Sequence, residues 1–345
     1  MKERQQNFEL LRIIAMFMIV ISHVSTHYIS AYDVQLASFN GFLLSILRSL
    51  ILICVNIYIL ITGYFSIHST KLKYRKLLNI ALLPGFISVI LLITLIFFGE
   101  VEFNIWQIVG KLFATLKGEY WFISNYFALY LFIPLLNKIF HSLSKREVQQ
   151  LLILNFLVGS LWASFMKDDV IVGFNSGFSL IFFIFLYFIG AYLRVYGPFF
   201  KDFNRREYLS TYLILGVLTG ILQFLIPIVD FFNYNGPFEL IMSYCFFMFI
   251  SKVEINSIKI NYIASYVLSV YLVHEQSEMR TFIWDLPFIH QIIGFSQITA
   301  IPAVILVAII VFIVSWIVGW LLTSIFERLE RVFYGWIDAN QNEAR

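Results

Sequence analysis

An arginine and a histidine near the start of the chain have the chemistry and the spacing of a working pair. Arg12 and His23 lie within residues 8–28, a run apolar enough to span a bilayer. A neutral imidazole in a membrane can act as a general base or accept an acyl group, and a guanidinium can hold an anionic donor. Eleven residues at about 100° each end about 20° past three full turns, so both side chains share one helix face, about 16 Å apart. Glu9, three residues before Arg12, is placed to orient the guanidinium and offset its charge.

Each member of this pair also has an ordinary structural explanation. Arg12 lies near the end of the span, where its side chain can snorkel to the lipid headgroups. His23 can hydrogen-bond a neighbouring helix. Because both lie on one face with Glu9 beside the arginine, and a polar stripe in lipid needs an explanation, we predict that His23, Arg12 and Glu9 are catalytic.

A cluster of basic residues follows the second apolar span. Anchoring to anionic lipid explains most of this cluster, since cytoplasmic loops are rich in Lys and Arg. The other interpretation is phosphate binding beside the first helix, which fits a nucleotide-bearing donor such as coenzyme A. The cofactor-binding residues expected on this interpretation are Arg12, Lys73, Arg75 and Lys76.

Arg48 is a charged residue within the second span. Such a charge costs ~2.5–3.5 kcal/mol on insertion scales unless it snorkels or finds a partner. Asp33, Glu239 and Glu275 are possible partners on the outer side, and the sequence alone does not choose among them. We treat Arg48 as a candidate contact for the substrate.

Two more polar groups lie where spans are expected to reach the outer side. Glu119, Tyr120 and Trp121 open the fourth span; an aromatic belt explains both rings without function, while Glu119 can bind a sugar hydroxyl or act as a base. His274 and Glu275 end the ninth span, where a histidine is commonly just solvated. All five are candidate substrate contacts.

The composition defines the class of protein that must position these residues. Hydrophobic residues make up 60% of the 345 and charged residues only 13%, which is more apolar surface than a soluble core can use. We expect an all-α polytopic membrane protein with a single transmembrane domain over residues 1–345. Cys54 and Cys245 fall inside apolar spans and are expected to be free buried thiols. The sequence has no Gly-rich phosphate loop and no Cys/His metal spacing, so we expect no metal and no nucleic-acid partner.

The apolar runs predict about ten transmembrane helices, the first of them uncleaved. The eighth and ninth are short and can be tilted, broken or partly re-entrant. Of the longer connections, residues 99–119 have helical apolar spacing and predict an amphipathic helix at the outer interface or over a cavity, whereas residues 276–298 are expected to be irregular. The ten spans are 8–29, 41–66, 77–98, 120–140, 148–166, 176–196, 208–229, 236–251, 261–275 and 299–325.

The distribution of Lys and Arg predicts the orientation of these spans. With both termini in the cytoplasm, 19 of the 24 Lys and Arg residues fall in inside segments and four in outside segments. This split follows the positive-inside rule, and an odd number of spans would scramble it. We therefore expect cytoplasmic N- and C-termini, with Arg12 at the cytoplasmic entrance and His23 in the outer half of the membrane.

Several stretches together resemble one known family, the membrane acyltransferase-3 proteins. Arg12 and His23 match the family's first-helix pattern of an arginine, ten residues and a histidine, and Glu9 matches its preceding acidic residue. The similarity runs through most of the chain and is closest to the branch that O-acetylates bacterial exopolysaccharides, capsules and related surface glycans. The other similar stretches are VNIYILITGYF at 55–65, EYWFISNYFALYLFIPLLNK at 119–138, FLYFIGAYLR at 185–194 and IASYVLSVYLVHE at 263–275.

This resemblance implies a function and its participants. Family members take an acetyl group from cytoplasmic acetyl-CoA and deliver it to a sugar hydroxyl at or beyond the outer face of the bacterial plasma membrane. Arg12 and His23 are then the functional pair. The family's arginine-rich motif at the third helix reads KLKYRKLLN here, so Arg75 and Lys76 are its nearest matches and Asn79 stands where a further arginine is common. The implied partners are the lipid bilayer, a glycan acceptor and separate polysaccharide-biosynthesis proteins.

Two alternatives stay open on the sequence. One is a transporter or flippase for a glycan or acylated precursor, although the chain has few mid-membrane acids and no inverted repeat. The other is an acyltransferase that acts on peptidoglycan, a lipid or a small molecule. The sequence also leaves open whether His23 is a base or an acyl carrier, and what the oligomeric state is.

Overall fold

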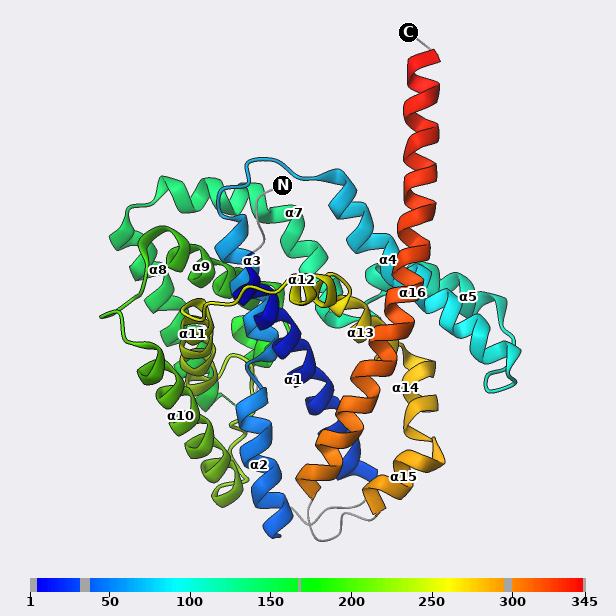
Figure 1. The fold of residues 1–345 in the computed structure, drawn as a ribbon. Coiled ribbons are helices and arrows are strands. Elements are labelled where there is room, and N and C mark those ends of the chain that lie inside the picture. Colours follow the sequence, from blue (N-terminus) through cyan, green and yellow to red (C-terminus); the bar gives the residue numbers. More distant parts are fainter. Residues whose placement is uncertain (1–4, 32–37, 167–168, 295–299, 344–345) are drawn as a thin grey trace.

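Helices account for all the regular structure that is described, which confirms the expected all-α class. The computed structural model describes residues 5–31, 38–166, 169–294 and 300–343, and no β-strand occurs within these ranges (Figure 1). The α-helices are α1 (Gln6–Ala31), α2 (Phe39–Ile51), α3 (Cys54–Ser66), α4 (Tyr74–Phe97), α5 (Ile105–Leu112), α6 (Ala114–Lys117), α7 (Trp121–Ser142), α8 (Lys145–Phe156), α9 (Leu180–Tyr196), α10 (Arg205–Leu225), α11 (Pro237–Ser251), α12 (Ile258–Ser265), α13 (Val267–His274), α14 (Ser277–Trp284), α15 (Pro287–Gly294) and α16 (Ala300–Glu343).

Many of these helices are built to cross a membrane. In the described part of the chain, seven helical stretches are long and apolar enough to do so, and α9 and α11 are shorter apolar helices. These nine match nine of the predicted spans in order, while the count of ten and the placement of both termini stay predictions. The seven stretches are Gln6–Ser30, Phe39–Ser66, Tyr74–Phe97, Trp121–Ser142, Lys145–Phe165, Arg205–Leu225 and Ala300–Tyr334.

The ninth predicted span is broken, one of the forms that its short length allowed. Helices α12 and α13 meet at Tyr266, whose backbone leaves the helical region at φ −112° and ψ 4°. At the break, the carbonyl oxygen of Ile263 accepts from the backbone N–H of Tyr266 at 3.2 Å and also from the indole Nε1–H of Trp316 in α16 at 3.1 Å. The break lets α13 end with His274 beside α1.

The predictions for the two long connections, residues 99–119 and 276–298, have different outcomes. The amphipathic helix expected within residues 99–119 is confirmed as α5, followed by the single turn α6. The expectation that residues 276–298 are irregular is wrong, because α14 and α15 occupy most of this segment and only residues 295–298 lie outside the described part. The side chain of Gln276 accepts a hydrogen bond from the backbone N–H of Met279 and caps α14, and Pro287 opens α15 at a position where proline favours a helix.

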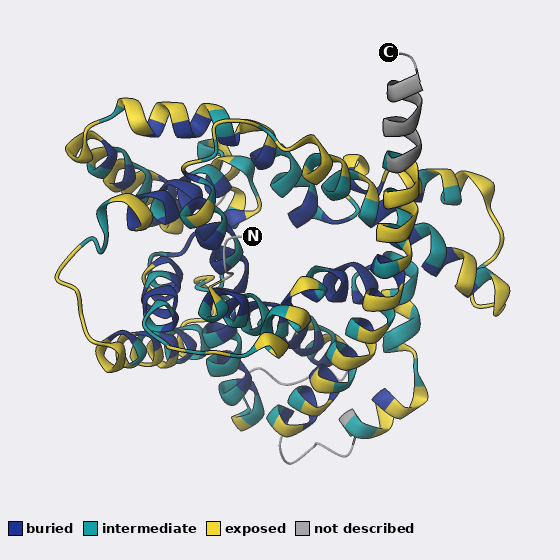
Figure 2. Ribbon diagram, turned by 45° about the horizontal axis from the view of Figure 1, so that its top comes forward, coloured by how far each residue is buried: buried dark blue, intermediate teal, exposed yellow. Residues whose placement is uncertain are grey.

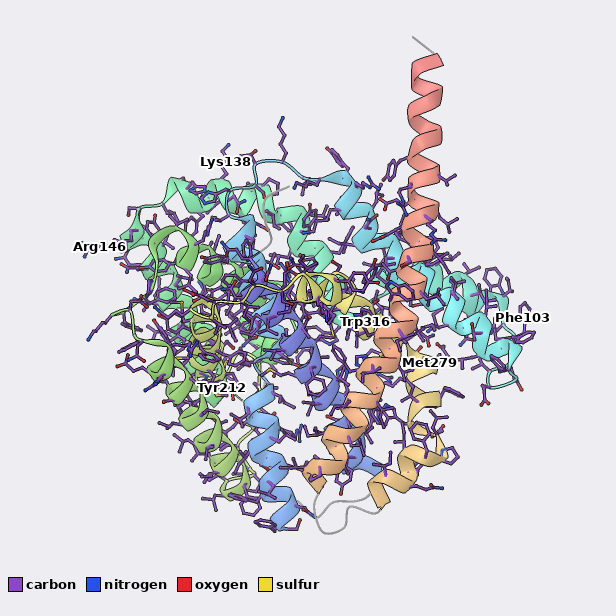
Figure 3. All side chains as sticks on the ribbon, in the orientation of Figure 1. Phe103, Lys138, Arg146, Tyr212, Met279 and Trp316 are labelled. Carbon is purple, nitrogen blue, oxygen red and sulfur yellow. The ribbon has the colours of Figure 1, made fainter. Side chains whose placement is uncertain are left out.

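Helix α1 runs through the middle of the bundle and contacts α3, α12, α13 and α16 (Figure 1). Leu11, Ala15, Val20 and Val24 are completely buried along it. Buried residues gather on the inward faces of the helices and exposed ones on the outside (Figure 2). Phe103, at the tip of the α4–α5 connection, points away from the bundle (Figure 3). This arrangement places the polar stripe of α1 among neighbouring helices, with Glu9 buried and Arg12 and His23 half-buried.

Helices α3 and α9 pack closely against each other, backbone to backbone. A Cβ on Gly63 would lie 2.1 Å from the carbonyl oxygen of Tyr187, and a Cβ on Gly190 would lie 2.2 Å from that of Leu60. Small residues at such crossings let two membrane helices approach backbone to backbone. The expected thiols are also confirmed, since Cys54 and Cys245 are free and buried.

Candidate active site

His23 forms a pair with His274, which the broken span brings to the middle of α1. Nδ1 of His23 lies 2.9 Å from Nε2 of His274, and Nδ1 of His274 lies 2.6 Å from the carbonyl oxygen of Val270. That carbonyl can only accept, so Nδ1 of His274 carries the hydrogen and its Nε2 is an acceptor. His23 therefore donates through Nδ1–H and keeps a lone pair on Nε2. The partners thus define the tautomer that a general base needs.

Glu275, the C-cap residue of α13, is the third member of this group. Its Oε1 lies 3.1 Å from Nδ1 of His23, and its Oε2 lies 3.4 Å from the Arg280 guanidinium. The carboxylate can stabilise the imidazolium that forms when Nε2 takes up a proton. A base held by a carboxylate through its other nitrogen is the arrangement of many acyl-transfer sites.

A narrow cavity with aromatic walls adjoins His23. The rings of Trp121 and Tyr234 lie 6.0 Å apart between their centroids, and Phe122 and Tyr271 lie 6.4 Å apart. Such walls limit the contact of bulk water with a group bound in the cavity. The cavity is lined by Met16, Ile19, Ser22, His23, Cys54, Val55, Tyr58, Trp121, Phe122, Tyr234, Leu268 and Tyr271.

The cluster also has a spacing that a metal ion can use. One ligand atom each from His23, His274 and Glu275 lies within 4.8 Å of the others. Hydrogen bonds already explain the arrangement, because the ring nitrogens that face one another form a donor and acceptor pair. The expected absence of a metal stays a prediction.

The three predicted substrate contacts at the start of α7 have different surroundings. They are Glu119, the N-cap Tyr120 and the first helical residue Trp121. Trp121 lines the cavity next to His23. Tyr120 is fully buried, where its hydroxyl lies 2.9 Å from Ser88 and donates to the carbonyl oxygen of Leu272 at 2.8 Å. Tyr120 thus joins α7 to α13, and Glu119 points instead into an ionic network. The structure therefore brings only Trp121 of these three to His23.

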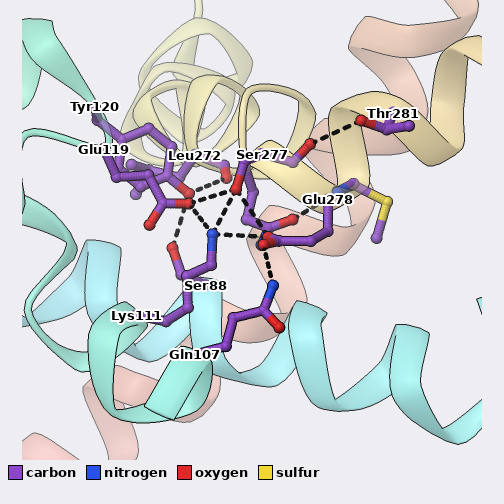
Figure 4. A network of polar contacts seen from close by, with 11 residues as sticks. Ser88, Gln107, Lys111, Glu119, Tyr120, Leu272, Ser277, Glu278 and Thr281 are labelled. Atoms are coloured by element: carbon purple, nitrogen blue, oxygen red, sulfur yellow. Dashed lines mark hydrogen bonds and ion pairs between the residues drawn. The ribbon is translucent and has the colours of Figure 1, made fainter. Parts of the chain in front are cut away.

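Lys111 is the centre of that network and joins three segments at one end of the site (Figure 4). Its ammonium group lies 2.5 Å from Oε1 of Glu119, 2.7 Å from Oε2 of Glu278 and 2.5 Å from Oγ of Ser277. Gln107 of α5 donates to Glu278 at 2.6 Å. Because α14 begins two residues after Glu275, the network fixes the backbone that presents Glu275 to His23.

Replacing Lys111 by methionine is expected to lower the thermal unfolding temperature markedly. Lys111 is only 7% exposed, and its loss leaves the two carboxylates facing each other; breaking a buried ion pair typically costs about 3–5 kcal/mol. Lys117→Met is the matched control, since Lys117 is an exposed lysine of the same connection. Equal unfolding temperatures for Lys111→Met and Lys117→Met in nanodiscs would show that the network does not stabilise the fold.

Acid is expected to weaken the same network. Burial alone would raise the pKa of Glu278, but hydrogen bonds from Lys111 and Ser277 and the charge of Lys111 outweigh it, so that pKa is lowered from 4.5. A carboxylate with a lowered pKa adds stability above its ordinary pKa, and that stability is lost as the pH falls below about 4.5. Unfolding temperatures measured from pH 6 to pH 3 should therefore fall more steeply for the wild type than for Lys111→Met.

Arg12 lies toward the other end of α1, in a second polar group. Its guanidinium is 2.5 Å from Glu9, and its carbonyl oxygen accepts a hydrogen bond from the Tyr58 hydroxyl at 2.8 Å. Lys76 lies over the ring of Tyr130 at 4.9 Å, and both Lys76 and Arg12 act electrostatically on Tyr126. Two of the four predicted donor-binding residues, Arg12 and Lys76, therefore share one region.

The other two predicted donor-binding residues have different neighbours. Arg75 lies 2.6 Å from Glu330 of α16 and stacks over Tyr334 at 5.3 Å, and Asn79 also contacts Glu330. Lys73 is exposed immediately before α4. Arg75 is thus engaged with α16, and its use by a donor requires release from Glu330.

Arg48 has none of the partners expected from the sequence among the described residues. Asp33 lies outside the described part of the chain, Glu275 pairs with His23 and Arg280, and no described ion pair joins Glu239 to Arg48. The Arg48 guanidinium instead lies over the ring of Phe232, 5.0 Å from its centroid.

Three residues of the site were not predicted from the sequence. Lys111 is one of only four Lys and Arg residues in the predicted outside segments. This rarity of cations on the outer side was the one sequence feature that could have pointed to it. Tyr58 falls within the family-like stretch 55–65, whereas nothing in the sequence pointed to Tyr234.

Comparison with known proteins identifies the class of protein. A family model described as an acyltransferase domain matches residues 5–320. The chain therefore belongs to the acyltransferase-3 family and is a membrane acyltransferase. No curated protein and no solved structure matches the chain.

Proposed function

We propose that this membrane acyltransferase moves an acetyl group from cytoplasmic acetyl-CoA to a hydroxyl of a bacterial surface glycan or exopolysaccharide. The observation that carries the proposal is the His23–His274–Glu275 group, of which His274 is buried and the other two are half-buried, next to a cavity with aromatic walls. Arg12, on the same helix toward the other end, supplies the charge that an anionic donor needs. The resemblance to glycan O-acetylating members of the family supports the choice of donor and acceptor, and with it the bacterial plasma membrane as the location.

The donor would bind first at the Arg12 region. Arg12 and Lys76 face the phosphates of acetyl-CoA, with Lys73 and Arg75 at the rim, because phosphates favour Arg and Lys contacts. The pantetheine arm extends along α1 toward His23, over the ~16 Å that three helical turns span. The thioester carbonyl then lies in the cavity that the aromatic rings shield from water.

His23 would act as the general base in the transfer. Its Nε2 takes the proton of the acceptor hydroxyl while the hydroxyl oxygen attacks the thioester carbonyl. The carbon–sulfur bond breaks, and the leaving CoA thiolate recovers the proton from Nε2. Glu275 and His274 hold Nδ1 throughout, and Glu275 stabilises the transient positive charge on the ring. A covalent acetyl group on His23 is the alternative order of events, and a trapped acetyl-histidine would identify it.

An assay with purified protein in nanodiscs tests the proposal. Labelled acetyl-CoA is added with de-O-acetylated bacterial surface glycan, and both free CoA and alkali-labile acetyl ester on the glycan are measured. We expect CoA release that depends on the glycan and equals the ester formed. Transport of glycan across sealed vesicles without any CoA release would instead favour a flippase.

A further inference from the structure

A second cavity lies between α2, the end of α10 and the connection from α10 to α11. It encloses about 420 Å³, a size typical of small-molecule sites. Arg48, Gln223, Asp230 and Phe232 are among its lining residues, and we call it the Arg48 cavity. The start of α2 and the end of α10 lie at the same end of the bundle, the end away from the N-terminus (Figure 1).

Arg48 is the charged hydrogen-bond donor of this cavity. It sits on a stretch long and apolar enough to span a membrane, where a charge is costly and usually marks a functional site. None of the ion pairs in the described part of the chain involves it. Its guanidinium lies over the face of Phe232, and the nearby charge of Asp230 attracts it. Four or five guanidinium N–H groups therefore remain for a ligand or water.

The other polar groups of the cavity are held in place by the backbone. Gln223 accepts a hydrogen bond from the N–H of Phe231 at 2.8 Å through its side-chain oxygen, which leaves its NH₂ group to donate. Asp230 accepts from the N–H of Phe232 at 2.9 Å through Oδ1, which leaves Oδ2 to accept. Donors on two sides and an acceptor on a third match a ligand with several hydroxyl groups. A simple anion fits less well, because Asp230 would repel it.

The Arg48 cavity and the His23 cavity share a wall. Phe232 lines the first and Tyr234 lines the second, two residues apart on one connection. Asn56 of α3 holds this wall by donating to the carbonyl oxygen of Tyr234 at 2.9 Å. A ligand that fills the Arg48 cavity thus lies beside the aromatic wall of the reaction site.

We propose that the Arg48 cavity binds a sugar unit of the acceptor and holds it next to the reaction site. This inference rests on the proposed function and deepens it, since it names the place and the groups that select a hydroxyl-rich acceptor. Arg48 and Gln223 donate to sugar oxygens, and Asp230 accepts from a sugar hydroxyl. Arg48 contacts the acceptor and takes no part in proton transfer.

Saturation-transfer NMR on the nanodisc-embedded protein tests this binding without any need for turnover. The probes are methyl glycosides of glucose, galactose, mannose and N-acetylglucosamine, with inorganic phosphate as a competitor. We expect saturation transfer to at least one glycoside, and a loss of at least fivefold in both Arg48→Met and Asp230→Asn. The control Arg206→Met, which removes an exposed arginine at the opposite end of α10, should bind as the wild type does.

Each outcome of this experiment decides the point. Equal transfer in all four proteins, or no transfer to any glycoside, overturns the proposal; displacement by phosphate that depends on Arg48 assigns the cavity to an anion instead. Asp230 is exposed in a connection, so Asp230→Asn stays informative if Arg48→Met unfolds, and unfolding temperatures identify that case. If the protein bound sugar but transferred no acetyl group, the proposed function would be wrong, whereas the assignment of the cavity as a sugar site would stand.

Discussion

Replacing His23 by glutamine is expected to lower the kcat for acetyl transfer by about 10²–10⁴, the usual contribution of a positioned general base. Glutamine can still donate to His274, so the packing of α1 against α13 should survive. It has no basic nitrogen to take the proton of the acceptor hydroxyl. The measurement is glycan-dependent CoA release by purified protein, and the KM for acetyl-CoA should change little because His23 lies far from the donor phosphates.

His27 offers a matched control for this change. It lies one turn further along α1 and stacks on Trp284 at 4.3 Å between ring centroids, and it does not line the cavity. His27→Gln should therefore retain most of the wild-type kcat. A native rate in His23→Gln, or an equal loss in both variants, would remove His23 from the chemistry.

Replacing Arg12 by glutamine is expected to raise the KM for acetyl-CoA by about 10-fold to 100-fold with a smaller change in kcat. A hydrogen bond to a charged group is worth about 1.5–3 kcal/mol, and each 1.4 kcal/mol is tenfold in affinity. The loss acts on ground state and transition state alike, which places it in KM. Arg12→Lys keeps the charge beside Glu9 but loses the planar fork, so it should lie between the wild type and Arg12→Gln.

The controls for Arg12 separate donor binding from general charge loss and from damage to the fold. Arg328→Gln removes an exposed arginine of α16 and should leave the KM for acetyl-CoA unchanged. Because Glu9 is buried, Arg12→Gln also leaves a carboxylate without its partner. The double variant Glu9→Gln with Arg12→Gln removes that penalty. If its KM for acetyl-CoA returned to the wild-type value, Arg12 would have a structural role only.

The candidate site was partly predictable because two of its residues, Arg12 and His23, lie close together in the sequence on one helix. Arg12 and His23 share a face through helical geometry alone, and the confirmed helix α1 places them as the 100° rotation requires. His274 and Glu275 were candidates as well, but only as separate acceptor contacts. The pairing of His23 with His274 joins residues 251 positions apart and, like the contact with Glu275, depends on the break at Tyr266.

The wrong expectation for residues 276–298 has a physical cause, and so has the position of Arg48. Residues 276–298 look irregular because they lack a long apolar run, yet a Gln276 cap and an opening Pro287 suffice for two short helices that pack on the bundle. Of the acids considered as partners of Arg48, Asp33 lies outside the described residues; the described neighbours of the guanidinium are the face of Phe232 and the charge of Asp230. Single residues rarely reveal which cation rests on which ring, since that pairing is made by packing.

The sequence by itself determined the class of this protein, its helices and the stripe on α1. A segment that crosses a bilayer needs a long apolar run whose backbone hydrogen bonds are all made within the protein. Such runs can be recognised directly in the sequence. Only the tertiary structure decided which nitrogen of His23 is free, which acids hold Lys111 and which ring covers Arg48. These depend on side chains from distant segments meeting within about 3–5 Å, and packing sets such distances where periodicity cannot.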